Sequence, residues 1–522
     1  MRLAILAILA ALPAAAQDSP PNPVDRYFDK YWKDNGIKTG PPADDYEFLR
    51  RASLDVLGRL PKPDEIRAFE KSKDRAKKID ELLGSPDAAE FFADTWLRIL
   101  MNYHFDETAP LRISFPAFRG YLKDAYARDL PYRDFATQLL SDVGDYKQKP
   151  ASNFILAALD PNQAEPPHEL TSRTTRIFLG IQIQCARCHD HPFDKYTQED
   201  FWGLTAFFEG LKPKARQTFD GFGVKLMSEQ KTMRMAIPDS KTEVAAHFLD
   251  GRAPEDPKAP LKSYAKYVVD HPLFSKAIVN RLWSHFMGRG FVEPIDKFSD
   301  RTKPNHPELL DALCEEFTRD GTRLHPFMKT ILLSKAYQAP CDAGKDHDLS
   351  THARMILKPQ NPVQVLNLLT WTLSLDVFLQ QFYQQYLKNF GDDNFFAKSY
   401  GNPEVFRMFT HVFTQSLLAP SGIAPEEAKY TGSVRLALKL MNGNDLQGLL
   451  KAEFGRLGDI MKKEKTPEGR LTEIFLTLLS RPPRAEEKER YLAYLQRKKG
   501  EPKAYEDVYW TLLNSTELFF NH

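Results

Sequence analysis

The sequence predicts a mainly α protein in which a small mixed α/β connector separates two helical domains. Apolar residues recur at helical spacing through most of the 522-residue chain, many of these stretches open with proline, and short apolar–polar alternations are confined to one central region. The predicted divisions are a lead-in at 17–43, a helical domain at 44–210, a connector at 211–262 and a helical domain at 263–522.

The first sixteen residues are typical of a secretory signal peptide. Arg2 supplies a positive charge, residues 3–12 are apolar, and Ala14-Ala15-Ala16 offers small residues for cleavage before Gln17. An uncleaved anchor is the alternative, but the apolar run is shorter than the roughly 20 residues that span a bilayer. We therefore expect an exported protein, periplasmic or secreted, with no transmembrane span in the mature chain.

The proline-rich lead-in at 17–43 predicts at most one short helix, and regular helical patterns follow it. Residues 46–57 form the first, stopped by Gly58, and Asp64 is expected to cap the next. Further helices are expected at 79–83, 91–100, 115–127 and 132–140. A helix starting near Thr171 should run to residue 183 and resume at 197–208, which places residues 185–194 at a helix-to-loop junction.

The connector and the second domain have different patterns. Short strands are expected at 224–227 and 233–236. Beyond the connector, the periodicity predicts helices at 272–287, 307–317, 326–337, 362–373, 471–479 and 508–520.

Composition excludes several classes of function. The chain has 71 Lys and Arg against 70 Asp and Glu, so charge favours neither nucleic acid nor an anionic membrane as a partner. It lacks a phosphate-binding loop, a nucleophile elbow and the paired histidines of zinc proteases, and no particular enzymatic activity is predicted. Among its four cysteines, Cys314 fits a buried apolar position, and a bridge from Cys314 to Cys341 stays open.

The clearest chemical signature is Cys185-Ala186-Arg187-Cys188-His189. Two cysteines separated by two residues and followed by histidine suit covalent attachment of haem c, because each thiol can add to a porphyrin vinyl group while the imidazole ligates iron. Export agrees with this interpretation, since bacterial haem ligation takes place outside the cytoplasm. A redox or structural pair of Cys185 with Cys188, and a zinc or other metal site, are the alternatives.

The zinc alternative uses Cys185, Cys188, His189 and His191, four nitrogen and sulfur donors within seven residues. Structural zinc usually takes two separated pairs of ligands, so His168 or His104 would have to replace one of them. Asp190 and Asp194 are better explained by turn formation and capping. A haem iron would take a sixth ligand, for which spacing singles out none of the candidates Met101, His104, Met227, Met233 and Met235.

The motif and its surroundings resemble a known family. Residues 185–194 and 196–208, with 48–51, 54–61 and 175–180 upstream, are similar to the planctomycete-specific cytochrome-c-like domain called PSCyt. Residues 271–274, 279–283, 288–294 and 512–522 are similar to its partner PSD domain of unknown function. Many members of that family have an additional N-terminal cytochrome c domain, whereas here we expect a single centre.

The resemblance implies an exported cytochrome-c-like protein that transfers electrons through haem held by Cys185, Cys188 and His189. Its partner would be an unidentified redox protein or an exported protein assembly. The alternative is an exported structural or carbohydrate-associated protein in which the motif forms a zinc site or a disulfide.

Overall fold

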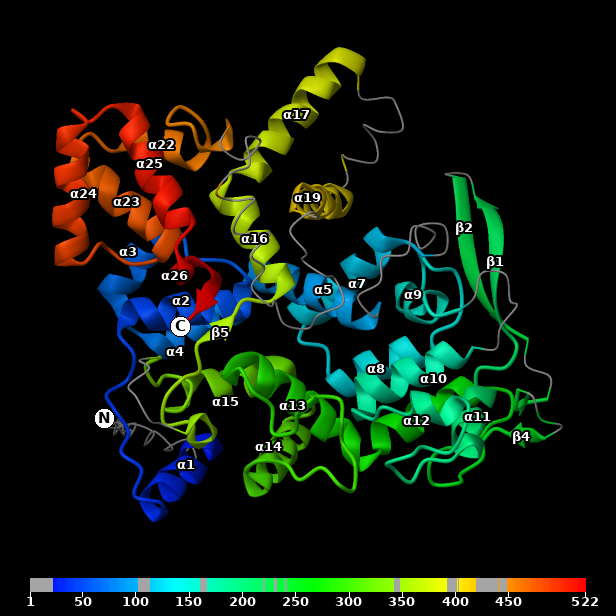
Figure 1. The fold of residues 1–522 in the computed structure, drawn as a ribbon. Helices are drawn as coiled ribbons and strands as arrows, with labels where there is room; N and C mark the ends of the chain where they lie inside the picture. Colours follow the sequence, from blue (N-terminus) through cyan, green and yellow to red (C-terminus); the bar gives the residue numbers. More distant parts are fainter. Residues whose placement is uncertain are drawn as a thin grey trace, which may run out of the picture.

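The structure is a computed structural model that describes residues 22–101, 113–159, 167–218, 221–229, 232–238, 240, 242–341, 348–391, 401, 403–418, 441 and 448–522. The described part is mainly helical, and its strands form only two-stranded sheets, which confirms the predicted fold class (Figure 1). The proposed signal peptide lies outside the described residues.

The helices of the first part of the chain are α1 (Pro23–Asp34), α2 (Asp45–Leu57), α3 (Pro63–Ser72), α4 (Arg75–Leu83), α5 (Pro86–Leu100), α7 (Phe115–Ala127), α8 (Tyr132–Ser141) and α9 (Asn153–Leu156). Side-chain caps start several of them, as where Asp44 accepts the amide of Glu47. The expectation that Asp64 caps α3 is wrong. Lys62 occupies the cap position instead, because Glu65 reaches back to the Lys62 amide at 2.8 Å.

The helix that leads toward the cysteine motif is shorter at its end than the periodicity predicts. It comprises α10 (His168–Thr174) and a π-helical turn (Thr175–Leu179), so it begins before Thr171 and stops well before residue 183. Gly180 adopts φ 65°, a left-handed conformation that ends the helix. The cysteines therefore lie on a separate 3₁₀ turn (Gln184–Arg187), and the chain resumes in α11 (Gln198–Ala206).

Two β-hairpins follow α11, in the region where the sequence predicts strands. β1 (Leu211–Thr218) pairs with β2 (Gly221–Ser228), and β3 (Arg234–Ala236) pairs with β4 (Glu243–Ala245), both antiparallel. The hairpin of β3 and β4 packs against α11. The elements around the motif thus form one local group, at the lower right of Figure 1.

The second part of the chain is again helical. Its helices are α12 (Pro260–Asp270), α13 (Pro272–Met287), α14 (Pro307–Arg319), α15 (Leu324–Leu333), α16 (Pro362–Thr372), α17 (Leu375–Phe390), α19 (Pro403–Leu418), α22 (Gly455–Lys463), α23 (Pro467–Leu479), α24 (Ala485–Arg497), α25 (Pro502–Leu513) and α26 (Thr516–Phe519). The single helix expected at 508–520 is broken at Asn514 and Ser515, where the Ser515 hydroxyl donates to the carbonyl of Leu512 at 2.7 Å.

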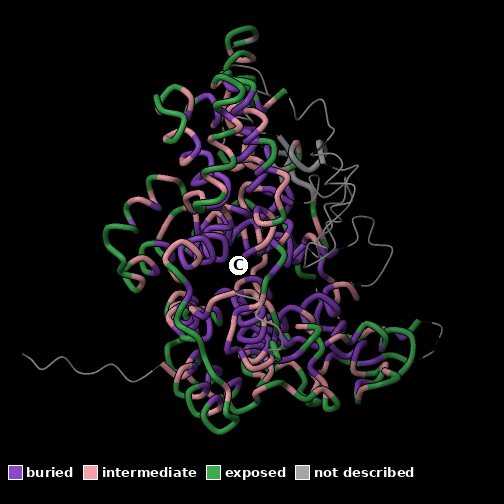
Figure 2. Tube along the Cα trace, turned by 60° about the vertical axis from the view of Figure 1, so that its left-hand side comes forward, coloured by how far each residue is buried: buried purple, intermediate pink, exposed green. Residues whose placement is uncertain are grey.

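The buried apolar side chains form two clusters. The first draws nearly all its members from residues 24–355 and so includes helices from both sides of the central hairpins. The second lies mainly within residues 365–518 and also takes in Leu54 and Leu60 from the first part of the chain. Buried segments accordingly run through the middle of the molecule, with exposed ones on the outer loops (Figure 2).

A buried polar network joins distant parts of the chain at Asp55. Lys358 Nζ donates to both carboxylate oxygens of Asp55 at 2.7 Å, Tyr337 Oη donates at 2.9 Å, and Asn521 Nδ2 donates at 2.7 Å. Lys358 belongs to β5 (Lys358–Pro359), which pairs with β6 (Phe520–Asn521) at the end of the chain. One carboxylate therefore connects α2, the segment after α15 and the C-terminal strand.

Among the described helices, none alone has both the length and the apolar character of a membrane span. Only α16 and α17 taken together, with a bend of 67° between them, meet that test.

Candidate functional site

The cysteine motif lies on the surface, anchored by its alanine. Ala186 is fully buried, and its amide donates to the carbonyl of Ile183 at 2.9 Å. Cys185 and Cys188 on either side are exposed free thiols, and the Cys188 amide donates to the Cys185 carbonyl at 3.3 Å. The 3₁₀ turn therefore presents both sulfur atoms on the accessible side of a fixed backbone.

Helix α11 holds the backbone of the motif in place. The indole Nε1 of Trp202 donates to the carbonyl oxygen of Arg187 at 3.0 Å, and Gln198 Nε2 donates to the same oxygen at 3.2 Å. Trp202 is buried, so its N–H needs such a partner. Sequence reasoning missed both residues, although a tryptophan one turn after the motif's loop was a usable signal.

The loop from residue 190 to 197 is closed by short-range hydrogen bonds. Asp190 Oδ1 accepts the Gln198 amide at 2.8 Å, and the His191 amide donates to the Tyr196 carbonyl at 2.8 Å. Asp194 accepts the amide of Lys195 at 2.8 Å, so both aspartates act in turns as predicted. Phe193 is 68% exposed, an unusual position for a phenyl ring.

The imidazole of His189 is oriented by the backbone. Its Nδ1 lies 2.8 Å from the carbonyl oxygen of Asp190, and because a carbonyl only accepts, Nδ1 is the donor. In the neutral ring Nε2 is then the unprotonated nitrogen, and it has no hydrogen-bond partner among the described residues. This arrangement, with Nδ1 bound to a carbonyl and Nε2 left for a metal, is common for histidines that ligate metals.

The other histidines near the motif have their nitrogen lone pairs engaged. His191 Nδ1 accepts the amide of Phe193 at 3.3 Å. His168 Nε2 lies 2.9 Å from Arg187 Nη1, and because a guanidinium only donates, this nitrogen is the acceptor. Neither of these atoms is available to a metal in this arrangement.

The described residues do not bring several metal-ligating side chains together. Within the described ranges, no group of three or more His, Cys, Asp or Glu side chains is placed to hold a metal ion. The two exposed thiols and Nε2 of His189 are the three groups that haem c would take from the motif.

The candidates for a sixth iron ligand are spread over several elements. Met101 is buried in the first apolar cluster, and Met227 lies on β2, half-buried. Met233 and Met235 are half-buried and pack against that cluster at the hairpin of β3 and β4. His104 lies outside the described residues.

An Asp–His pair joins α11, which carries Asp200, to His247 in the segment just after β4. Asp200 Oδ1 is 3.8 Å from His247 Nε2, and both side chains are largely shielded. Interaction with the Asp200 carboxylate raises the pKa of His247. Burial alone would raise the pKa of Asp200, but its interaction with His247 and its hydrogen bonds from Thr197 outweigh that effect and lower it. A Cβ at Gly203 would come within 2.2 Å of the His247 ring, so glycine is needed there.

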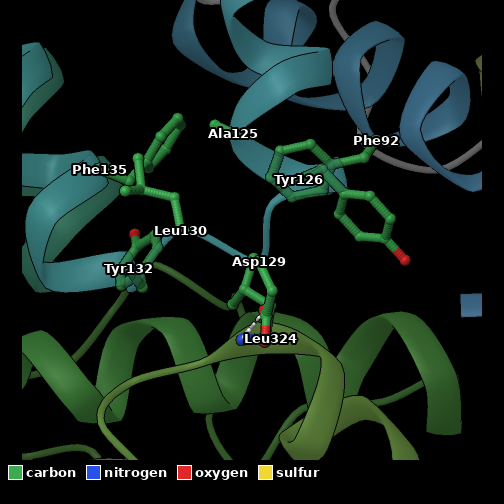
Figure 3. A pocket seen from close by; sticks show the side chains of 8 residues that line it. All are labelled: Phe92, Ala125, Tyr126, Asp129, Leu130, Tyr132, Phe135 and Leu324. Atoms are coloured by element: carbon green, nitrogen blue, oxygen red, sulfur yellow. Dashed lines mark hydrogen bonds between the residues drawn. The ribbon is translucent and has the colours of Figure 1, made fainter. Parts of the chain in front are cut away.

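A small cavity lies elsewhere in the helical core (Figure 3). Its volume is about 10 Å³, room for one water molecule. Its lining is mostly aromatic and apolar and comprises Phe92, Ala125, Tyr126, Asp129, Leu130, Tyr132, Phe135 and Leu324. None of these residues belongs to the motif or its loop, and the cavity is too small for an organic substrate.

Comparison with known families matches two parts of the chain. Residues 23–213 match the model PSCyt2, protein of unknown function (DUF1549), and residues 264–365 match PSD1, protein of unknown function (DUF1553). Both families and their order confirm the resemblance found in the sequence. No curated protein and no solved structure matches the chain.

Proposed function

We propose that this protein, which has a PSCyt2 domain followed by a PSD1 domain, is an exported electron-transfer protein with one haem bound covalently to Cys185 and Cys188. In this proposal His189 is an iron ligand through Nε2. The observation on which it chiefly rests is the joint geometry of the motif. Two free, exposed thiols are separated by two residues, and the adjacent imidazole of His189 has an Nε2 with no partner among the described residues.

The attachment chemistry needs no oxidant. Each S–H adds across a vinyl double bond of the porphyrin, so that sulfur bonds to one carbon and hydrogen to the other. When bound, haem supplies a one-electron iron couple whose potential depends on the axial ligands and on burial. The thioether bonds make retention of the group independent of non-covalent affinity.

The residues around the motif have definite roles in this proposal. The Asp190 carbonyl keeps the His189 ring in one tautomer and orientation, with Nε2 left as the nitrogen for iron. Trp202 and Gln198 keep the motif's backbone from moving relative to α11. Phe193 offers an exposed aromatic face close in sequence to the iron ligand, suited to packing against a flat apolar group.

The alternative is an exported structural or carbohydrate-associated protein in which the motif forms a zinc site or a disulfide between Cys185 and Cys188. Exposure of both thiols is compatible with that oxidation as well. The two proposals differ in colour and mass, so one preparation distinguishes them.

The test is expression of the full-length chain in a host competent for covalent haem ligation, followed by spectroscopy of the unfolded protein. We expect haem absorbance to stay with the chain after denaturation, because thioether bonds survive unfolding. Cys185→Ser and Cys188→Ser should each weaken or abolish attachment, whereas the control Cys341→Ser, at a thiol outside the motif, should not. Wild-type chain that is colourless while a known c-type cytochrome matures in the same host would refute the proposal.

A further inference from the structure

Two segments at opposite ends of the chain have the same sequence pattern. Residues 57–65 read Leu-Gly-Arg-Leu-Pro-Lys-Pro-Asp-Glu, and residues 479–487 read Leu-Ser-Arg-Pro-Pro-Arg-Ala-Glu-Glu. Farther along, residues 82–85 read Leu-Leu-Gly-Ser and residues 512–515 read Leu-Leu-Asn-Ser, and in each case an acidic residue stands two positions after the serine. The preceding helices, α2 and α23, both have 13 residues.

In the first segment Arg59 connects two helix starts. Its Nη1 and Nη2 donate to the two carboxylate oxygens of Glu65, both at 2.9 Å, and its Nε donates to Asp87 at 2.7 Å. Nη1 also donates to the carbonyl of the next residue, Leu60, at 2.9 Å. Glu65 in turn accepts the Lys62 amide, so the same carboxylate caps α3 and binds the guanidinium.

In the second segment Arg481 makes the same bonds with the same atoms. Its Nη1 and Nη2 donate to the two oxygens of Glu487 at 2.7 and 2.9 Å, and its Nε donates to Glu517 at 2.7 Å. Nη1 donates to the carbonyl of the next residue, Pro482, at 3.2 Å. Glu487 accepts the Arg484 amide at 2.7 Å, as Glu65 accepts that of Lys62.

The backbone turns also correspond. Gly58 and Ser480, which end α2 and α23, have φ of 65° and 60°, and each amide donates to the carbonyl four residues earlier. The left-handed conformation is uncommon for serine, so its occurrence at Ser480, in the position that corresponds to Gly58, supports the equivalence of the two turns. Ser85 and Ser515 both donate through Oγ to the carbonyl three residues earlier, at 2.8 and 2.7 Å.

We infer that residues 466–522 are a second copy of the helical module formed by residues 44–87, and that the α2–α3 face of the first copy is the docking surface for the second. A single arginine–glutamate cap can arise independently. Here the two segments agree in several independent features, and chance does not explain that agreement. They share the three acceptors of the guanidinium, the left-handed residue, the capping amide and the serine turn. None of these residues belongs to the cysteine motif, so the inference is independent of the proposed function.

Contacts between the copies identify the docking surface. Arg50 of α2 is buried and donates through Nη2 to the carbonyls of Glu517, Leu518 and Phe520 at 2.8, 3.2 and 3.3 Å. Arg67 of α3 pairs with Glu473 of α23. Figure 1 shows α23 and α26 beside α2 and α3, and Leu54 and Leu60 of the first copy belong to the second apolar cluster.

The copies differ beyond the final turn. In the first copy, the helix that starts after Ser85 is α5, which has 15 residues and leads into the rest of the PSCyt2 match. In the second copy, the corresponding helix is α26, which has four residues and is followed by β6. The end of the chain is therefore an integral partner of the PSCyt2 domain, bound by Arg50 and by the network at Asp55.

The duplication is tested by a graft within the full-length chain. Residues 480–487 are replaced by the sequence of residues 58–65, and the same graft is also combined with Arg481→Gln. If the segments are equivalent, the graft keeps the amide hydrogen exchange of α23 and α24 within about twofold of the wild type. The combined variant should exchange about tenfold faster there, because Glu487 and Glu517 lose a charged donor. A graft that exchanges as fast as the combined variant overturns the duplication.

Docking is tested with Arg67→Gln, and Lys71→Gln, at an exposed position of the same helix, is the matched control. Loss of the pair with Glu473 should speed exchange in the middle of α23 about two- to fivefold, as for a partly exposed ion pair, while the control leaves α23 unchanged. Equal exchange in α23 for both variants overturns the assigned docking surface.

Discussion

Replacing Lys358 by methionine should destabilise the protein far more than a lysine substitution usually does. Lys358 Nζ is bound by both oxygens of Asp55 at 2.7 Å and by the carbonyls of His285 and Phe286 at 3.1 and 2.8 Å. The side chains of Lys358 and Asp55 are 9% and 1% exposed, so water cannot replace the lost ammonium group.

The magnitude is set by the groups that remain after the substitution. Asp55 keeps its hydrogen bonds from Tyr337 and Asn521, but its negative charge is left without a cation in the interior. Breaking a buried ion pair in this way typically costs about 3–5 kcal/mol of unfolding free energy. We expect about 4 kcal/mol for Lys358→Met. A double variant with Asp55→Asn should recover part of that loss, about 2 kcal/mol, because the uncompensated charge is removed.

Urea denaturation monitored by circular dichroism measures these differences. The matched control is Lys195→Met, which removes an exposed pair with Asp300 whose side chains are 64% and 73% exposed. Such pairs contribute under about 1 kcal/mol. If Lys358→Met and Lys195→Met unfold at the same urea concentration, the Asp55 network does not connect the chain as described.

Three further expectations concern the surroundings of the motif. The pKa of His247 is raised by Asp200, so protonated His247 stabilises the adjacent hairpin fully below the pKa of the unfolded state, about 6.5. This stabilisation is lost as the pH rises through the higher pKa of the folded state. The lowered pKa of Asp200 keeps the carboxylate charged, and the pair intact, until more acidic pH. Amide exchange of β3 and β4, corrected for the intrinsic rate, should therefore show less protection at about pH 8 than at about pH 5.5, and His247→Gln should abolish the difference; equal protection would contradict the pairing. Trp202→Phe should lower the opening free energy of residues 184–189 by about 1 kcal/mol, seen in the same exchange experiment, and unchanged exchange would mean that its indole bond does not hold the motif. In protein made without haem, an alkylating reagent should modify Cys185 rapidly and Cys314 slowly, because burial raises the pKa of Cys314 to about 12; similar rates by peptide mass mapping would contradict the assigned burial.

Local sequence patterns were sufficient to predict most of the helices. Phe115–Ala127 and Pro272–Met287 have the predicted bounds, because each has an apolar face and a residue at its end that stops the helix. The predicted helix before the motif is too long at its C-terminal end because residues 181–183 are apolar. Apolar character alone does not distinguish a buried turn from a helix. Gly180 was the local signal for the true end.

The roles of residues that act through contacts with distant parts of the chain could not be predicted from local sequence patterns. Asp55 and its donors Lys358 and Asn521 are separated by 303 and 466 positions, and no periodicity in either segment indicates the other. At the site, the sequence identified Cys185, Cys188 and His189 as a motif. It could not identify Trp202 as the donor to the backbone of Arg187, because that bond depends on how α11 packs.

The most direct test of the central proposal is the intact mass of the unfolded mature chain, made in a host competent for haem ligation and measured before and after reduction. The proposal predicts a mass equal to the polypeptide plus one haem, with the added mass on the peptide that contains Cys185 and Cys188. A reduced chain with the mass of the polypeptide alone, and two hydrogens less before reduction, would contradict it and would indicate a disulfide between the two cysteines.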